Sequence, residues 1–132
     1  MIVYNSEKYK NEVKEKWGNT EAYQQHLENT KNYSKQKWDN LALEMDHIMA
    51  KFALSMKNGM SYDSLDVLEL VEMLQKHITN NYYNCTNDIL AGLGKMYVLD
   101  SRFKNNIDKH GEGTAEFISK AIEVYFKKII TE

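Results

Sequence analysis

The stretch from Ser34 to Asn58 limits the possible folds of this chain more than any other segment. Its apolar side chains recur at helical spacing and would line one face of a long amphipathic helix: Trp38, Leu41, Met45, Ile48, Met49, Phe52 and Met56. Ser34 is a candidate N-cap, Tyr33 and Trp38 stand at the two positions of a hydrophobic staple, and Asn58-Gly59 would end the helix. The chain contains no proline, so nothing in it forces a helix to break.

Four further helices are predicted after this one, each behind a residue that can cap it. The predicted caps are Asp63 or Ser64, then Thr86, then Asp100 or Ser101, and finally Thr114. The first of the four would end near Asn80-Asn81, and the third would pass through Phe103 and Ile107 and end at His110-Gly111. The other buried faces would be Val67, Leu70, Val71, Leu74, His77 and Ile78; Ile89, Leu93, Met96 and Tyr97; and Phe117, Ile118, Ala121, Ile122, Tyr125 and Ile129.

The first 33 residues differ in character, because their apolar side chains are sparse and lie among Lys, Glu, Gln and Asn. We expect two helices there, the first ended by Gly18 and the second capped by Asn19, with Trp17 at the corner between them. A helix pair with so thin an apolar face gains little from packing. The hypothesis is that residues 1–33 form a lid that is mobile when free and helical when a ligand is bound, on a helical body of residues 34–132.

Length and composition favour one all-α domain over residues 1–132, with about six to seven helices, since 42% apolar content suffices for a core. The net charge is −2 and the charges are interspersed, so we expect no direct contact with nucleic acid. No apolar run approaches 18 residues and no signal peptide is visible, which predicts a cytoplasmic protein with no membrane contact. A single cysteine excludes an internal disulfide.

Three separated blocks carry a family resemblance: Trp17-Gly18-Asn19-Thr20 followed by Tyr23, Tyr82-Tyr83-Asn84-Cys85, and the run from Leu93 to Phe103. In this order they resemble the TipAS antibiotic-recognition domain family, and the similarity extends from about Tyr9 to Ile129. The resemblance implies a helical fold related to the globins and a deep cleft for thiopeptide macrocycles or other bulky antibiotics. Such domains are often the effector half of MerR-type transcription activators. This chain lacks the DNA-binding half, so a stand-alone sequestering form and a fragment of a longer regulator both stay open.

Aromatic and methionine side chains suit flat, weakly polar ligands, and they supply most of the candidate ligand-binding residues. A domain of this length has a radius of gyration of about 14 Å, so closing a lid over a macrocycle is easier than opening a cavity of that size in the core. Trp17 and Tyr23 would anchor that lid, although ordinary packing explains them as well. Leu93 and Met96 could equally be core, and His47 could equally be solvated surface. The full set is Trp17, Tyr23, Tyr33, Trp38, His47, Tyr82, Tyr83, Cys85, Leu93, Met96 and Tyr97.

Cys85 could be a nucleophile or a small buried side chain, and its sequence neighbours supply no cation that would activate it. In the family, covalent capture of a ligand uses a cysteine seven residues further on, where this chain has Gly92. We therefore expect reversible binding of a small-molecule antibiotic by a monomer or weak homodimer, with no catalytic residue. The four histidines have no ligand spacing, so neither a metal nor a cofactor is expected. The alternatives are a helical dimerisation module and a cysteine-dependent enzyme that pairs Cys85 with a histidine.

Overall fold

The computed structural model describes residues 7–131, without the side chains of residues 7–10, 13, 130 and 131. The described residues form seven helices and no strand, which confirms the predicted all-α fold: α1 (Glu7–Trp17), α2 (Glu21–Thr30), α3 (Lys35–Lys57), α4 (Leu65–Asn81), α5 (Asn87–Leu99), α6 (Ser101–Asp108) and α7 (Thr114–Thr131). The first six residues of the predicted lid lie outside the described range. Within that range, no helix is long and apolar enough to span a membrane.

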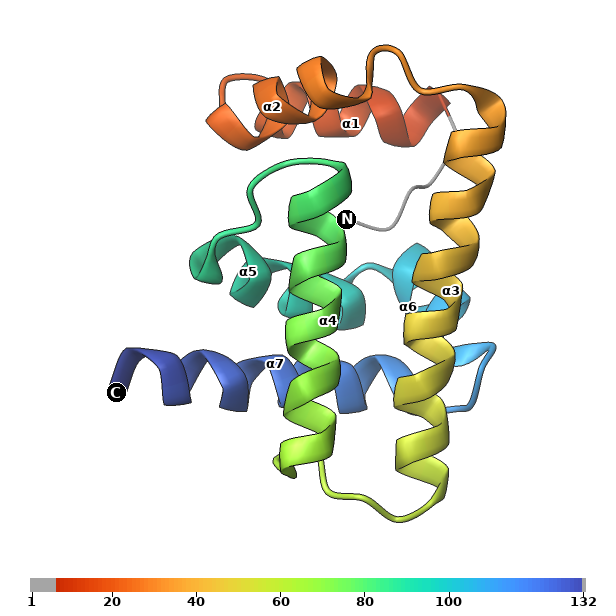
Figure 1. Cartoon of the computed structure of the whole chain (residues 1–132), viewed down its shortest axis with the longest axis vertical. Helices are drawn as coiled ribbons and strands as arrows, with labels where there is room; N and C mark the ends of the chain where they lie inside the picture. Colours follow the sequence, from red (N-terminus) through yellow and green to blue (C-terminus); the bar gives the residue numbers. More distant parts are fainter. Residues whose placement is uncertain (1–6, 132) are drawn as a thin grey trace.

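Helices α3, α4, α5 and α6 are arranged around α7 (Figure 1). Helices α3 and α4 run antiparallel side by side, and α7 crosses them and packs against α3, α4, α5 and α6. Helices α1 and α2 lie together across the end of the molecule where α3 begins and α4 ends. We call α1 and α2 the lid helices, because they make up most of the segment predicted to be a lid.

Four predicted N-caps are confirmed, and they fix where the helices of the body begin. The side-chain oxygens of Ser34, Ser64, Thr86 and Asp100 each accept a hydrogen bond from a backbone N–H of the first helical turn. This contact satisfies a donor that would otherwise have no partner inside the helix. The predicted staple is also present, because the rings of Tyr33 and Trp38 meet edge to face with centroids 5.4 Å apart. Gly59, with a φ of 77°, takes the left-handed conformation that ends α3.

Two predicted caps were wrong. Helix α2 is capped by Thr20 and not by Asn19, because the Thr20 hydroxyl accepts from Tyr23 N at 3.1 Å and also donates to Trp17 O at 2.7 Å. Thr114 lies inside α7, and its hydroxyl donates backwards to Gly111 O at 2.6 Å. The capping interaction at α7 comes from Asp108, whose Oδ1 accepts from Ala115 N at 2.8 Å.

The buried faces follow the predicted spacing with small rotations. Leu68 and Leu90 are buried, although they were not predicted to be. The residues predicted inside that are only half-buried are Trp38, Met56, Leu70, Ile89, Met96, Phe117, Tyr125 and Ile129. At the crossing of α5 and α7 the helices approach closely: a Cβ on Gly94 would lie 3.1 Å from Ile122 Cγ2. The hydrogen at Gly94 therefore allows this contact between the two helices.

Candidate functional site

A cleft of about 530 Å³ lies between α3 and the end of α6, on the half of α3 that is nearest the lid helices. Its apolar lining comes from one face of α3, with Tyr82 from the end of α4, and its polar lining comes from both sides. The lining residues are Asp39, Ala42, Leu43, Met45, Asp46, Met49, Tyr82, Asn106, Lys109 and His110. The volume falls within the range of roughly 300–1,000 Å³ that is usual for small-molecule sites.

Asp46 is the centre of the polar lining. Its Oδ1 lies 2.8 Å from His110 Nε2 and 3.6 Å from Lys109 Nζ, so a cation from the end of α6 balances the carboxylate of α3. Asp39 is similarly paired with Lys35, at 2.9 Å. Because these charges are matched within the protein, the cleft presents hydrogen-bonding groups without a strong excess of either sign.

Tyr82 belongs to an aromatic cluster that joins the lid helices to the body. The ring of Tyr82 stacks with His26 of α2 at 5.9 Å and lies 6.1 Å from Trp38, while Tyr33 contacts Trp38. We call His26, Tyr33, Trp38 and Tyr82 the aromatic cluster. Burial is the largest cause that raises the pKa of the Tyr82 hydroxyl to about 12, so the hydroxyl stays protonated at neutral pH.

Hydrogen bonds reinforce the docking of α2 on the segment that follows α4. Asn29 Nδ2 donates to Tyr82 O at 3.1 Å, and Gln25 Oε1 accepts from the backbone N–H of Asn84 at 2.8 Å. The Tyr33 hydroxyl donates to Asn81 O at 2.6 Å. These contacts satisfy backbone groups at the end of α4, so α2 docks by polar complementarity in addition to ring packing.

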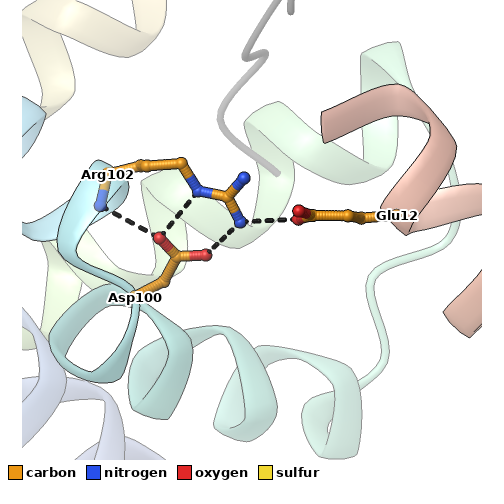
Figure 2. A network of polar contacts seen from close by, with 3 residues as sticks. All are labelled: Glu12, Asp100 and Arg102. Atoms are coloured by element: carbon orange, nitrogen blue, oxygen red, sulfur yellow. Dashed lines mark hydrogen bonds and ion pairs between the residues drawn. The ribbon is translucent and has the colours of Figure 1, made fainter. Parts of the chain in front are cut away.

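Helix α1 contacts the body through an arginine (Figure 2). Arg102 Nη2 donates to Glu12 Oε2 of α1 at 2.7 Å and to Asp100 Oδ2 at 2.7 Å. Arg102 Nε and its backbone N–H both donate to Asp100 Oδ1, at 3.1 and 2.9 Å. The hydrogen bonds from Arg102 hold the pKa of the Asp100 carboxyl below its ordinary value. The ionised Asp100 thus fixes the arginine in position to meet Glu12.

The structure places the predicted ligand-binding residues in three settings. Tyr33, Trp38 and Tyr82 meet in the aromatic cluster, and Tyr82 also lines the cleft. Tyr83, Cys85, Leu93 and Tyr97 are buried in the core, and Met96 packs against it half-buried. Trp17 is 44% exposed at the end of α1, Tyr23 is half-buried on α2, and His47 is exposed outside the cleft. A ligand-binding role for these eleven side chains stays a prediction.

Cys85 lies in a closed environment. Burial raises the pKa of its thiol to about 11, and its backbone N–H donates to Thr79 Oγ1 at 3.1 Å. A thiol that stays protonated at neutral pH is a poor nucleophile, which agrees with the packing role preferred above. Among the described residues, no group of three or more His, Cys, Asp or Glu side chains is arranged to hold a metal ion.

Sequence reasoning missed most of the cleft's lining. Met45 and Met49 were assigned to the inner face of their helix, but Asp46, Lys109 and His110 were not recognised as one polar cluster. Asp46 and His110 are 64 residues apart, and no local pattern relates them. His26 was considered only as a metal ligand, although its aromatic neighbours show that it packs in the lid interface.

A second hollow of about 630 Å³ lies along α3 and α4, on a different face of α3. Three carboxylates line it, from Glu44, Glu69 and Glu72, and Lys76 pairs with Glu72 at 2.8 Å. Its excess of negative charge suits an uncharged, weakly polar ligand less well than the balanced α3–α6 cleft does. We therefore take the α3–α6 cleft as the candidate site.

The fold and the cleft define an all-helical domain with a cleft beside a docked pair of N-terminal helices. The chain belongs to the TipAS antibiotic-recognition domain family, whose model matches residues 9–125. It is 36% identical over 119 residues to the HTH-type transcriptional activator TipA of Streptomyces coelicolor, covering 90% of this chain and 47% of the relative. It is 34% identical over 124 residues to the HTH-type transcriptional activator mta of Bacillus subtilis, covering 94% of this chain and 47% of the relative.

The chain thus spans about half the length of the curated relatives that it matches. Among solved structures, it resembles TipAS from Streptomyces lividans in complex with the thiopeptide antibiotic nosiheptide. The TM-score is 0.86 at 34% sequence identity, and the match covers 96% of this chain and 88% of the other. The family resemblance read from the three sequence blocks is therefore confirmed.

Proposed function

We propose that this chain binds a bulky antibiotic, a thiopeptide-like macrocycle or another amphipathic drug, reversibly and without catalysis. The observation that carries the proposal is the likeness to TipAS in complex with nosiheptide over nearly the whole chain. The α3–α6 cleft supports it, because an apolar floor with a few hydrogen-bonding groups is the usual composition of a small-molecule site. The buried, protonated thiol of Cys85 speaks against a cysteine-dependent enzyme.

The lid helices are the part of the proposal that concerns mechanism. The cleft is large enough for part of a macrocycle, so the remainder would extend beneath the lid helices and contact them. A ligand that contacts both the cleft and the lid helices favours the docked state by those contacts. Under this proposal the lid helices order on binding, and the ordering stabilises the complex and slows release.

In the cell, the domain would act in one of two settings. Alone, it would lower the free concentration of the drug by sequestration in the cytoplasm. Joined to a DNA-binding half, as in activators such as TipA, it would serve as the effector domain that reports the drug. The proposal assigns no contact with DNA to this chain itself, because its charges are mixed and its net charge is −2.

Two leucines of α3 provide a test with a matched control. Leu43 lines the cleft and Leu54 does not, yet both side chains are 59% exposed. Leu43→Arg would place an unmatched charge against a weakly polar ligand, so the affinity for nosiheptide should fall by about tenfold or more. Leu54→Arg should leave the affinity unchanged. Titration of intrinsic tryptophan fluorescence with nosiheptide measures both, since Trp38 lies in the aromatic cluster.

Three outcomes would contradict the proposal. If nosiheptide and a panel of other amphipathic antibiotics neither bind the chain nor raise its melting temperature, the antibiotic-binding function is wrong. Equal affinities for the Leu43→Arg and Leu54→Arg variants would place the ligand outside the α3–α6 cleft. A change in the mass of the ligand recovered after incubation, or a covalent adduct that survives denaturation, would contradict reversible binding without catalysis. Mass spectrometry detects both.

A further inference from the structure

Arg102 joins two elements that are far apart in the sequence, with Glu12 on α1 and Asp100 at the start of α6 (Figure 2). The same nitrogen, Nη2, lies 2.7 Å from a carboxylate oxygen of each partner. The side chain of Arg102 is 31% exposed and that of Glu12 is 43% exposed, so the contact is partly shielded and still open to solvent at one edge.

Asp100 fixes the orientation of the Arg102 side chain. It caps α6 through its own Oδ1, which ties the carboxylate to the backbone of the body. Its two oxygens then accept from Nε and Nη2 of Arg102, so the guanidinium is held by a two-point hydrogen bond. A planar guanidinium fixed on one edge presents its remaining donors in a set direction, which a flexible lysine cannot do.

The described side chains of α1 contribute little apolar burial. Among its described side chains, Asn11, Lys14, Glu15 and Lys16 are exposed, and Trp17 is 44% exposed with Lys16 Nζ over its ring at 5.1 Å. A helix with so much solvated surface depends on directed polar contacts for its orientation. Among the described side chains, Glu12 provides such a contact, to Arg102 on α6, 90 residues away.

We propose that Arg102 is a positioning residue that holds α1 in its docked orientation, and that this contact sets how long a bound antibiotic stays in the cleft. This inference rests on the proposed function, because it assigns a kinetic role at the same site. Release requires the lid helices to move away, and the contact between Glu12 and Arg102 breaks when α1 moves. Removing the contact therefore speeds dissociation of the ligand more than it slows association.

The test is a double-mutant cycle on the full chain, with nosiheptide as the probe. Arg102→Gln and Glu12→Gln should each raise the dissociation rate constant by about threefold to tenfold. The double variant should dissociate no faster than the faster single variant, because both substitutions remove one shared interaction. Arg102→Lys keeps the charge without the two-point contact to Asp100 and should fall between the wild type and Arg102→Gln. Glu15→Gln is the matched control on α1 and should leave the rate unchanged.

Two further readouts separate positioning from a general loss of stability. Raising the salt to about 1 M shortens the screening length to about 3 Å, so the rate difference between wild type and Arg102→Gln should shrink. Hydrogen exchange of the nosiheptide-saturated proteins should show faster exchange of α1 amides in Arg102→Gln, with α7 unchanged. Additive rate effects in the cycle, or equal exchange of α1 in both proteins, would overturn the inference.

The two proposals fail in different ways. If nosiheptide does not bind wild-type protein, the proposed function loses its support, and the kinetic role of Arg102 that rests on it is wrong as well. If nosiheptide binds wild type and Arg102→Gln with the same dissociation rate, the function stands and the positioning role of Arg102 is wrong.

Discussion

Two glycines of α5 allow the packing of the body to be measured by a matched pair of substitutions. A Cβ on Gly94 would lie 3.1, 3.2 and 3.3 Å from Cγ2, Cβ and Cδ1 of Ile122, whereas a Cβ on Gly92 meets nothing within 4 Å. Carbon atoms prefer separations of about 3.5–4.0 Å. Ile122 is 1% exposed, and the crowded atoms include its Cβ, so its side chain cannot simply turn away into solvent.

Both alanine variants gain helix propensity, worth about 1 kcal/mol, and only Gly94→Ala also acquires a strain of about 1–3 kcal/mol. Gly92→Ala should therefore raise the free energy of unfolding by about 0.5–1 kcal/mol. Gly94→Ala should leave it unchanged or lower it by up to about 2 kcal/mol. The difference between the two variants isolates the strain at the crossing, because the propensity gain is common to both. One kcal/mol corresponds to about 3–5 °C in the melting temperature of a domain of this size.

Thermal unfolding followed by circular dichroism at the helical band measures both variants under the same conditions, with urea unfolding as a second estimate of the free energy. Gly94 does not line the α3–α6 cleft, so the affinity of folded Gly94→Ala for nosiheptide should follow the wild type. If both variants raise the melting temperature equally, helix α7 can move away from α5 without cost, and the close-packed crossing is not a constraint.

Three smaller predictions test the aromatic cluster and the core. Burial lowers the pKa of His26 and His77 from 6.5, so below pH 6.5 the unfolded chain binds more protons than the folded protein. The free energy of unfolding should therefore be at its full value above pH 6.5 and fall as the pH drops towards the folded-state pKa values. An unchanged melting temperature between pH 7.5 and pH 5.5 would refute this. The Cys85 thiol should react with alkylating reagents slowly in the native protein and rapidly in denaturant, and fast native labelling followed by mass spectrometry would contradict its burial. Tyr33→Phe keeps the ring and removes the hydrogen bond to Asn81 O, so the melting temperature should fall by the equivalent of about 1 kcal/mol, and no change would show that water replaces the contact.

Local signals made the body of the fold predictable. Ser34, Ser64, Thr86 and Asp100 each cap a helix that starts at the next residue, and the apolar spacing after each cap gives the buried face. The same reasoning failed at Thr114, where a carboxylate six residues upstream, Asp108, accepts from the first turn of α7. A cap supplied from beyond the adjacent residues leaves no signature at the helix start, so the sequence pattern could not reveal it.

The cleft was less predictable because its polar groups meet only in three dimensions. Asp46 looks like an ordinary charged residue on a long helix, and Lys109 and His110 look like the end of a short one. Their contacts depend on the angle at which α6 approaches α3, and no residue type near either helix reports that angle. Of the tyrosines singled out from the sequence, Tyr82 lines the cleft, but the sequence could not show that Tyr83 and Tyr97 are core.

The composition of the lid helices explains why they dock as they do. Apolar residues are sparse in the first 33 positions, and the described side chains of the lid helices add oriented polar contacts to their ring packing, from Gln25 and Asn29 of α2 and Glu12 of α1. Each such contact exchanges hydrogen bonds with water for hydrogen bonds with the body, so its net contribution is only about 1 kcal/mol. Under the proposed function, a pair of helices held in this way separates from the body without unfolding it. The balance between docked and separated states then lies within the few kcal/mol that a ligand touching both sides can supply, and this is the physical condition for a lid that responds to a drug.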